Sequence, residues 1–527
     1  MKLLQLPLSV MLILASFLSC KKNSDPTTVS VKTMELTISK PNIDLNARSG
    51  IDTLIIQSNG SWKFSPHTDI SWLHLSREEG VAGSTTVYLM SEANPSNLPR
   101  SATFTINSLD YPPGNVSLNV NQSSELKVTG FQNFQAPGGA TLEIFGRGFS
   151  SIPSANTVSI NGIQAVVQTA NATSLQVIVP SMAGSGPVIV AAFNNSDTSD
   201  KDFIYQWTGT VTVVAGGVQG HLDGTGSSAK FSHPSGITFD ANNNMYVADY
   251  ASNKVRKITP AYVVTTMPGR FAPWNNPTGP TTDFALPTST VADANGNLFV
   301  VEFNAHAISK ISASGNVSIL AGGNQSGLVN GLGTAASFNH PVDAAIDAWG
   351  NLYIADKDNY CIRKITSAGM VSTFVGGPGG YQDGTGTGAR FNRPTGVAFD
   401  AASNLYVTDF YNNRIRKVSP TGVVTTFAGT GSHGSRDGNI LTEATFTNPN
   451  AIAVAKNGII YVSELNGDNR IRIINLKGKV ETISSFVLEG SSALFQFNGI
   501  YGLGLDNNGI LYATDYYNNR ICKITYK

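Results

Sequence analysis

The feature that most constrains this chain is an internal repeat of roughly fifty residues that fills its second half. The marker Phe-x-x-Pro begins at five regularly spaced positions and returns in weakened form at a sixth: Phe231, Phe284, Phe338, Phe391, Phe446 and Phe497. An acidic residue ends an apolar segment after each marker: Asp249, Glu302, Asp356, Asp409, Glu464 and Asp515. Because both series advance by the same steps, the sequence predicts six copies of one unit, as in a propeller or solenoid.

Each copy holds four short apolar segments separated by turn residues, as in residues 236–266, which predicts four strands and therefore one propeller blade. The last copy stops before its fourth segment, and a matching segment, residues 209–216, precedes the first copy. We expect residues 209–216 to pair with residues 520–524, because that pairing closes the ring and removes its exposed edges. The predicted fold class is all-β, which the recurring turn residues also favour.

Residues 404–409 and 413–418 carry the repeat in its clearest form and resemble NHL repeats. The resemblance extends over residues 207–527 and all six copies. It implies a six-bladed NHL-type β-propeller.

Two segments precede the repeats. Residues 36–124 contain Trp62 and Trp72 in an alternating apolar and polar pattern and resemble a BACON domain. Residues 126–206 contain the glycine-rich stretch 138–149 and resemble an IPT/TIG domain. Both resemblances imply immunoglobulin-like β-sandwich domains, and the first implies contact with carbohydrate or mucin.

Residues 1–20 combine a basic start with an apolar stretch and end at Cys20, which resembles a bacterial lipoprotein signal peptide. The resemblance implies that Cys20 is lipidated, that residues 21–35 form a tether, and that the lipid anchor alone contacts the membrane. It also favours the outer membrane, with exposure at the cell surface. The alternative is an ordinary secretory signal with an incidental cysteine.

The remaining cysteines, Cys361 and Cys522, belong to the third and sixth copies. These copies lie on opposite sides of a closed ring, whereas a disulfide needs Cα atoms within about 7 Å, so we expect two free, buried thiols. The chain carries 35 basic and 35 acidic residues, and this balance disfavours nucleic acid as a partner.

A side chain present in every copy answers a need that every copy has, so we interpret the six acidic residues as structural and not catalytic or metal-binding. Asp409 with Asn413 and Arg414 suggests a carboxylate that accepts backbone donors of the next turn and pairs with arginine. Asp515 with Asn519 and Arg520 suggests the same.

The histidines do not have the spacing of a zinc site, and His233 and His340 stand where other copies have Leu286, Arg393 and Asn448. The Asp-Gly-Thr-Gly stretches at residues 223–226 and 383–386 lack the lysine of a phosphate loop and predict turns. We therefore predict no catalytic residue, no metal and no cofactor.

Positions that break the repeat are better candidates for ligand contact. Residues 268–277 replace the usual glycine-rich connection before the second copy, and residues 485–490 replace it before the sixth. These stretches and their neighbours supply four candidate ligand-binding residues: Arg270, Trp274, Phe495 and Tyr501. Aromatic loops of this kind suit stacking on a sugar or clamping a peptide. The alternative is divergent packing between blades.

These features predict a lipid-anchored, cell-surface binding protein. Glycan is the leading ligand class, because lipoproteins with BACON domains resemble components of polysaccharide-uptake systems. One alternative is a protein–protein scaffold within an outer-membrane complex, with a surface protein as partner. Another is a lyase or hydrolase that uses the channel of the propeller.

Overall fold

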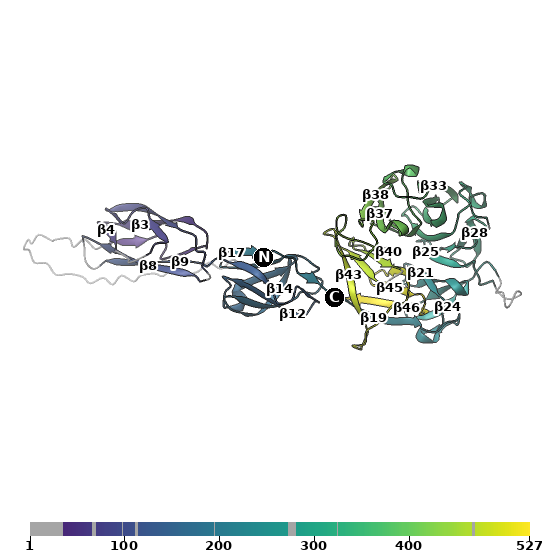
Figure 1. Cartoon of the computed structure of the whole chain (residues 1–527), viewed down its shortest axis with the longest axis horizontal. Coiled ribbons are helices and arrows are strands. Elements are labelled where there is room, and N and C mark those ends of the chain that lie inside the picture. Colours follow the sequence, from purple (N-terminus) through teal and green to yellow (C-terminus); the bar gives the residue numbers. More distant parts are fainter. Residues whose placement is uncertain are drawn as a thin grey trace, which may run out of the picture. The chain divides into compact units, whose positions relative to one another are not determined.

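The computed structural model describes residues 35–65, 70–96, 98–110, 114–193, 195–271, 281–323, 325–465 and 469–527. The chain divides into two compact units, Met1–Glu125 and Leu126–Lys527, which we call the N-terminal and C-terminal units. Strands dominate both units, and the helices of the described residues are single turns of 3-10 helix (Figure 1). Residues 1–34, and Cys20 with them, lie outside the described residues.

The N-terminal unit consists of two sheets around one core. The first runs in the order β1 (Leu36–Ile38), β3 (Gly50–Ser58), β7 (Gly83–Ser91) and β5 (Leu73–Leu75). The second runs in the order β2 (Asn42–Leu45), β9 (Asn115–Gln122), β8 (Arg100–Ser108), β4 (Trp62–Phe64) and β6 (Glu79–Gly80). Side chains of both sheets alternate between core and solvent, and Trp62 and Trp72 are buried in the core.

The C-terminal unit begins with residues 126–205, which we call the linking domain. Its main sheet runs in the order β10 (Lys127–Phe131), β12 (Thr141–Arg147), β15 (Ser174–Ile178), β14 (Ile163–Ala170), β13 (Asn156–Ile160), β16 (Val188–Ala192) and β17 (Asn195–Thr198). A parallel pair, β11 (Gln135–Ala136) and β18 (Ile204–Tyr205), lies beside it. One turn of 3-10 helix, η1 (Pro153–Ala155), precedes β13.

The rest of the C-terminal unit is a ring of antiparallel groups of four strands, two of which join into one larger sheet, and it has a β-propeller-like fold (Figure 1). The inner strands are β21 (Pro234–Phe239), β25 (Pro287–Ala292), β30 (Pro341–Ile346), β35 (Pro394–Phe399), β40 (Pro449–Val454) and β44 (Ile500–Leu505). The second strands are β22 (Met245–Asp249), β26 (Leu298–Glu302), β31 (Leu352–Asp356), β36 (Leu405–Asp409), β41 (Ile460–Glu464) and β45 (Leu511–Asp515). Each inner strand contacts the next, and β44 contacts β21.

The third strands are β23 (Lys254–Ile258), β27 (Ala307–Ile311), β32 (Cys361–Ile365), β37 (Arg414–Val418), β42 (Ile471–Ile474) and β46 (Arg520–Tyr526). The outer strands are β24 (Val263–Thr266), β28 (Val317–Gly322), β33 (Met370–Gly376), β38 (Val423–Ala428), β43 (Lys479–Leu488) and β19 (Trp207–Gly216). Four short strands extend the sheets: β20 (Gly224–Thr225), β29 (Gly331–Leu332), β34 (Gly384–Thr385) and β39 (Gly438–Asn439). As predicted, Cys361 and Cys522 are free and buried.

The predicted pairing of the first and last segments is confirmed. Strand β19 runs antiparallel to β46, with Gly209 opposite Tyr526 and Gly216 opposite Arg520 (Figure 1). Its other edge pairs in parallel with β43, so the last two sheets form one continuous sheet. The prediction of a loop at residues 485–490 is wrong, because Ser485 to Leu488 belong to β43 and pair with β19. Residues 485–488 depart from the repeat because they pair with β19 where the two sheets join, a junction that we call the seam.

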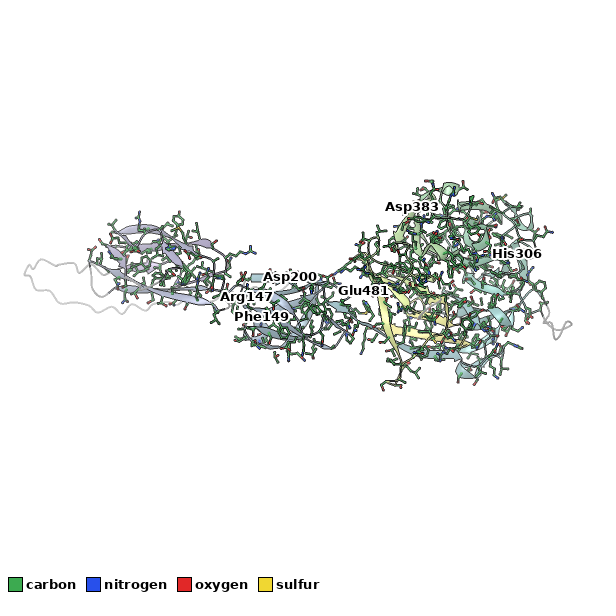
Figure 2. All side chains as sticks on the ribbon, in the orientation of Figure 1. Arg147, Phe149, Asp200, His306, Asp383 and Glu481 are labelled. Carbon is green, nitrogen blue, oxygen red and sulfur yellow. The ribbon has the colours of Figure 1, made fainter. Side chains whose placement is uncertain are left out.

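The linking domain packs directly on the ring, and the two share one hydrophobic core that includes Val188, Trp207 and Ile483. Glu481 of β43 accepts a hydrogen bond from the Ser185 backbone N–H at 2.6 Å, and Lys479 pairs with Asp202 at 2.7 Å (Figure 2 labels Glu481). Apolar burial and these polar contacts hold the linking domain and the ring together as one unit.

We predict that Val211→Pro opens the ring. Both edges of β19 are paired at residue 211, so the lost N–H leaves a buried ladder acceptor without its donor, at a cost of about 1–3 kcal/mol. Chemical denaturation should show reduced stability, and size-exclusion chromatography should show self-association through the freed edges. Thr198→Pro in β17, which pairs on one side only, is the control. A monomeric Val211→Pro protein of unchanged stability would contradict the closure.

Candidate functional site

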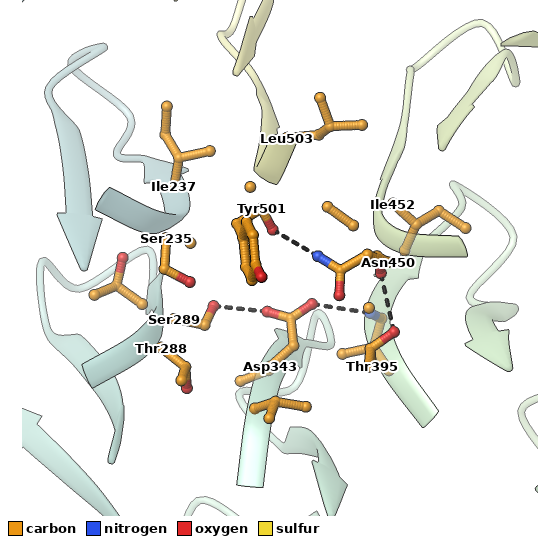
Figure 3. A pocket seen from close by; sticks show the side chains of 18 of the residues that line it. Ser235, Ile237, Thr288, Ser289, Asp343, Thr395, Asn450, Ile452, Tyr501 and Leu503 are labelled. Carbon is orange, nitrogen blue, oxygen red and sulfur yellow. Dashed lines mark hydrogen bonds between the residues drawn. The ribbon is translucent and has the colours of Figure 1, made fainter. Parts of the chain in front are cut away.

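The inner strands surround a cavity of about 410 Å³ at the centre of the ring (Figure 3). Residues near the start of these strands line it, together with the first residues after several second strands. The cavity therefore opens at the end of the ring where inner strands begin and second strands finish, which we call the mouth. Its volume is within the range of small-molecule sites.

The wall of the cavity is rich in hydroxyl groups and carries one carboxylate, that of Asp343. Asp343 follows Val342 in β30 and is partly exposed to the cavity. Its Oδ1 accepts a hydrogen bond from Ser289 Oγ at 2.6 Å, and its Oδ2 accepts one from the Val397 N–H at 2.9 Å (Figure 3). The carboxylate thus links three adjacent inner strands. Separation from bulk water raises the pKa of Asp343 to about 6, although both hydrogen bonds act in the opposite sense.

Aromatic side chains form one side of the mouth. Tyr501 stacks on Tyr516 with ring centroids 4.0 Å apart, and Tyr250 lies 6.2 Å from Tyr516. Burial, followed by the hydrogen bond to Tyr517, raises the pKa of Tyr501, so its hydroxyl stays neutral near pH 7. Three aromatic residues of the cavity lining directly follow a second strand, which places them at the rim: Tyr250, Phe303 and Tyr516.

Lys357 lines the same cavity from the 3-10 turn η5 (Lys357–Asn359), after β31. Burial lowers its pKa, the neighbouring Asp358 acts to raise it, and Arg393 acts to lower it further. In other copies the equivalent places hold Phe410 of η7 (Phe410–Asn412) and Leu465. The wall therefore combines stacking surfaces, hydroxyl groups, one carboxylate and one ammonium group.

The six acidic residues at the ends of the second strands are buried and fully engaged. Each accepts a hydrogen bond from a backbone N–H seventeen residues earlier, as in Asn392 to Asp409 at 2.7 Å. Each also pairs with an arginine: Asp249–Arg256, Glu302–Arg270, Asp356–Arg363, Asp409–Arg416, Glu464–Arg472 and Asp515–Arg520. This geometry agrees with a structural role.

The predicted partners of Asp409 were wrong. It pairs with Arg416 at 2.8 Å and accepts from Asn412 Nδ2 at 2.9 Å, while Asn413 Oδ1 accepts from the Asn448 N–H. The side chain of Arg414 turns to the Thr430 carbonyl. For Asp515 the prediction of Arg520 was right, but the amide partner is Asn518, at 3.0 Å. In both copies the backbone donor precedes the inner strand and does not belong to the next turn.

Arg270 takes the place of a missing arginine. Four third strands supply the arginine that pairs with their acid from one shared position, and β46 supplies Arg520 from its first residue. Strand β27 has Ser309 at the shared position. Arg270, from the preceding connection, fills the gap and binds Glu302 with Nε–Oε1 and Nη2–Oε2 distances of 2.9 and 3.0 Å. Its side chain is only 11% exposed, so its guanidinium is committed to the fold.

The four predicted ligand-binding residues are not brought together. Tyr501 lines the central cavity, Arg270 borders a separate hollow with Phe271, and Phe495 borders a third hollow with Phe486. Phe495 is also mostly buried, and the Arg520 guanidinium carbon lies 4.2 Å from the centroid of its ring. Trp274 lies outside the described residues.

The sequence reasoning missed Asp343, Lys357 and the rim tyrosines. The signal was present in the aligned inner strands, whose third residues are otherwise small: Gly236, Ser289, Gly396, Ala451 and Gly502. Asp343 breaks that series. In the N-terminal unit, burial of Trp62 and Trp72 leaves neither ring open for stacking on a ligand.

The described ranges contain no group of three or more His, Cys, Asp or Glu residues placed to hold a metal ion. Within the same ranges, no helix has the length and apolar character needed to cross a membrane.

Three family models match the chain. The BACON model, described as "Putative binding domain, N-terminal", matches residues 60–123, the IPT/TIG domain model matches residues 126–205, and the NHL repeat model matches residues 391–418. The three predicted resemblances are confirmed.

Among curated proteins, NHL repeat-containing protein 2 of Bos taurus is 28% identical over 333 residues, covering 55% of this chain and 45% of that protein. Its Homo sapiens counterpart is 27% identical over 330 residues, with the same coverage. Teneurin-4 of Mus musculus is 24% identical over 300 residues, covering 50% of this chain and 10% of teneurin-4. The chain thus spans less than half the length of these relatives.

Among solved structures, an auxiliary nutrient binding protein from Bacteroides ovatus is 19% identical, covers 77% of this chain and 98% of its own, and has a TM-score of 0.36. A protein of unknown function from Bacteroides thetaiotaomicron has the same identity and coverage and a TM-score of 0.48. A streptogramin B lyase is 15% identical, with a match that covers 60% of this chain and 98% of the lyase chain and has a TM-score of 0.40.

We predict that Arg270→Met lowers the free energy of unfolding by about 3–5 kcal/mol, because it leaves the buried Glu302 carboxylate without its cation. Adding Ser309→Arg should restore much of the loss by supplying the arginine from β27. Arg436→Met, at an exposed arginine, is the control for urea denaturation. Unchanged stability of Arg270→Met would show that Arg270 is free to bind a ligand.

We predict that Asp343→Asn stabilises the protein at pH 8 by up to about 3 kcal/mol and has little effect at pH 4. The folded-state pKa is raised from 3.8 to about 6, so the wild-type carboxylate loses stability as pH rises between these values. Without a charge, the amide oxygen can still accept from the Val397 N–H, and the amide nitrogen can donate to Ser289 Oγ, which reverses the second hydrogen bond. Urea denaturation across this pH range measures the difference, and a difference that does not depend on pH would contradict the assignment.

Proposed function

We propose that this chain is a lipid-anchored, cell-surface binding protein that takes a glycan ligand in the central cavity of its ring. In this proposal the ring is a six-bladed NHL-type propeller, the two preceding domains are immunoglobulin-like spacers, and Cys20 carries the lipid. The observation that carries the proposal is the open cavity, where the Tyr501–Tyr516 stack faces hydroxyl groups and the Asp343 carboxylate.

Saccharides present both apolar ring faces and dense hydroxyl groups, so they need stacking surfaces and hydrogen-bonding groups at once. The cavity supplies Tyr501 and Tyr250 for the first need and Thr288, Asn450 and Asp343 for the second. The BACON match adds support, since its description names a binding domain.

The position of the mouth also suits a surface protein. The linking domain contacts the ring at the turn between β42 and β43, where Lys477 Nζ donates to Asn161 Oδ1 at 2.7 Å. That turn lies at the end opposite the mouth, because third strands run away from the mouth. The linking domain therefore leaves the mouth of the cavity uncovered.

The test is a glycan-array screen followed by calorimetry on the best saccharide. We predict that Tyr501→Ala weakens binding at least about tenfold through loss of the stacking surface, while Tyr501→Phe binds nearly as wild type. Trp349→Ala is the control, because this tryptophan is 71% exposed on a turn at the opposite end of the ring. Loss of binding in Trp274→Ala, with Tyr501→Ala unaffected, would move the site to the connection before the second blade.

A further inference from the structure

The mouth of the cavity has two chemically different sides. The aromatic side consists of Tyr501 in β44, Tyr516 directly after β45 and Tyr250 directly after β22. The other side carries Lys357, which directly follows β31 and lines the cavity. A neutral sugar would need only the aromatic side and the hydroxyl-rich wall, so the cationic side calls for a separate explanation.

Lys357 is a partly buried cation that makes no direct ion pair, although the neighbouring Asp358 acts on it through space. In the part of the chain that the structure describes, its Nζ makes no hydrogen bond or ion pair and lies 5.9 Å from the Phe303 ring. The adjacent Asp358 is committed elsewhere, with Oδ2 2.8 Å from His340 Nδ1 and Oδ1 3.1 Å from Arg393 Nε. Burying an ammonium group without a counter-ion costs free energy, and the lowered pKa of Lys357 reflects that cost.

The fold does not require this lysine. The residue that follows the buried acid is Tyr, Phe, Lys, Phe, Leu and Tyr in the six copies: Tyr250, Phe303, Lys357, Phe410, Leu465 and Tyr516. Among these six, Lys357 is the cation, and it lines the cavity. A partly buried charge that the repeat does not demand, without a direct ion pair and facing an open cavity, is characteristic of a binding group.

We infer that the cavity binds an acidic saccharide, one whose sugar ring carries a carboxylate or a sulfate group. The inference rests on the proposed glycan-binding function. The sugar ring stacks against the Tyr501 side of the mouth, and its anionic substituent pairs with Lys357 on the other side. Asp343, whose two oxygens already accept hydrogen bonds from Ser289 and Val397, lies among the hydroxyl-rich strands and contacts neutral parts of the ligand.

Calorimetry with the full chain tests this inference. The probes are an α-1,4-linked galacturonate trisaccharide, a sulfated chondroitin tetrasaccharide and, as the neutral counterpart, a galactose trisaccharide. We expect at least one acidic probe to bind about tenfold or more tightly than the neutral one. Whichever acidic probe shows the preference identifies the anion as carboxylate or sulfate.

Lys357→Met should abolish that preference by lowering affinity for the acidic probe at least about tenfold more than affinity for the neutral probe, whereas Lys357→Arg should retain the preference. Lys364→Met is the matched control, since this lysine of the same sheet lies over Tyr353 away from the cavity. Thermal melting of Lys357→Met should give a melting temperature at or above that of wild type, because a desolvated ammonium group is removed and no direct ion pair is lost.

Equal affinity for acidic and neutral probes, or an equal effect of Lys357→Met on both, would overturn this inference and leave the proposed glycan site standing. Absence of binding to every saccharide, on the array and in solution, would overturn the proposed function as well.

Discussion

The ring depends on one interaction, the burial of a carboxylate at the end of every second strand. A buried carboxylate is tolerated only when charge and hydrogen bonds compensate its lost hydration. Here a backbone N–H from the segment before the inner strand and an arginine do so in each copy, as Asn392 and Arg416 do for Asp409. Four of the arginines also donate to the loop before the inner strand of their sheet, as Arg416 does to Asp383. The buried carboxylate and its arginine thus join the second strand, the third strand and the loop before the inner strand at the mouth end of the sheet.

The two sheets that lack the usual arginine show how strict this requirement is. Where β27 has Ser309, the guanidinium of Arg270 arrives from the preceding connection, and where β46 has Cys522, Arg520 approaches from the start of the same strand. An unusual residue in a repeat can therefore compensate for another unusual residue. Arg270 broke the pattern for this reason, and the stretch around Phe486 broke it because β43 pairs with β19 at the seam.

The cavity is made from positions that this framework leaves free to vary. The third residue of each inner strand only has to be small enough for neighbouring strands to approach, and the residue after each acid only has to leave the second strand. Asp343 and Lys357 occupy one position of each kind, both in the third sheet. Functional variation can gather there because neither position takes part in satisfying the buried acids.

The sequence by itself determined the strands, their grouping in fours, the pairing of residues 209–216 with the last copy, and the three family resemblances. These follow from apolar periodicity and repetition, which are local or self-consistent along the chain. Only the tertiary structure decided which side chains share the cavity, because Tyr501, Asp343 and Lys357 meet through closure of the ring and not through spacing. It also decided that Arg270 pairs with Glu302. Strand β27 has Ser309 where other third strands have arginine, so the buried carboxylate pairs with the cation that the packed chain brings nearest to it.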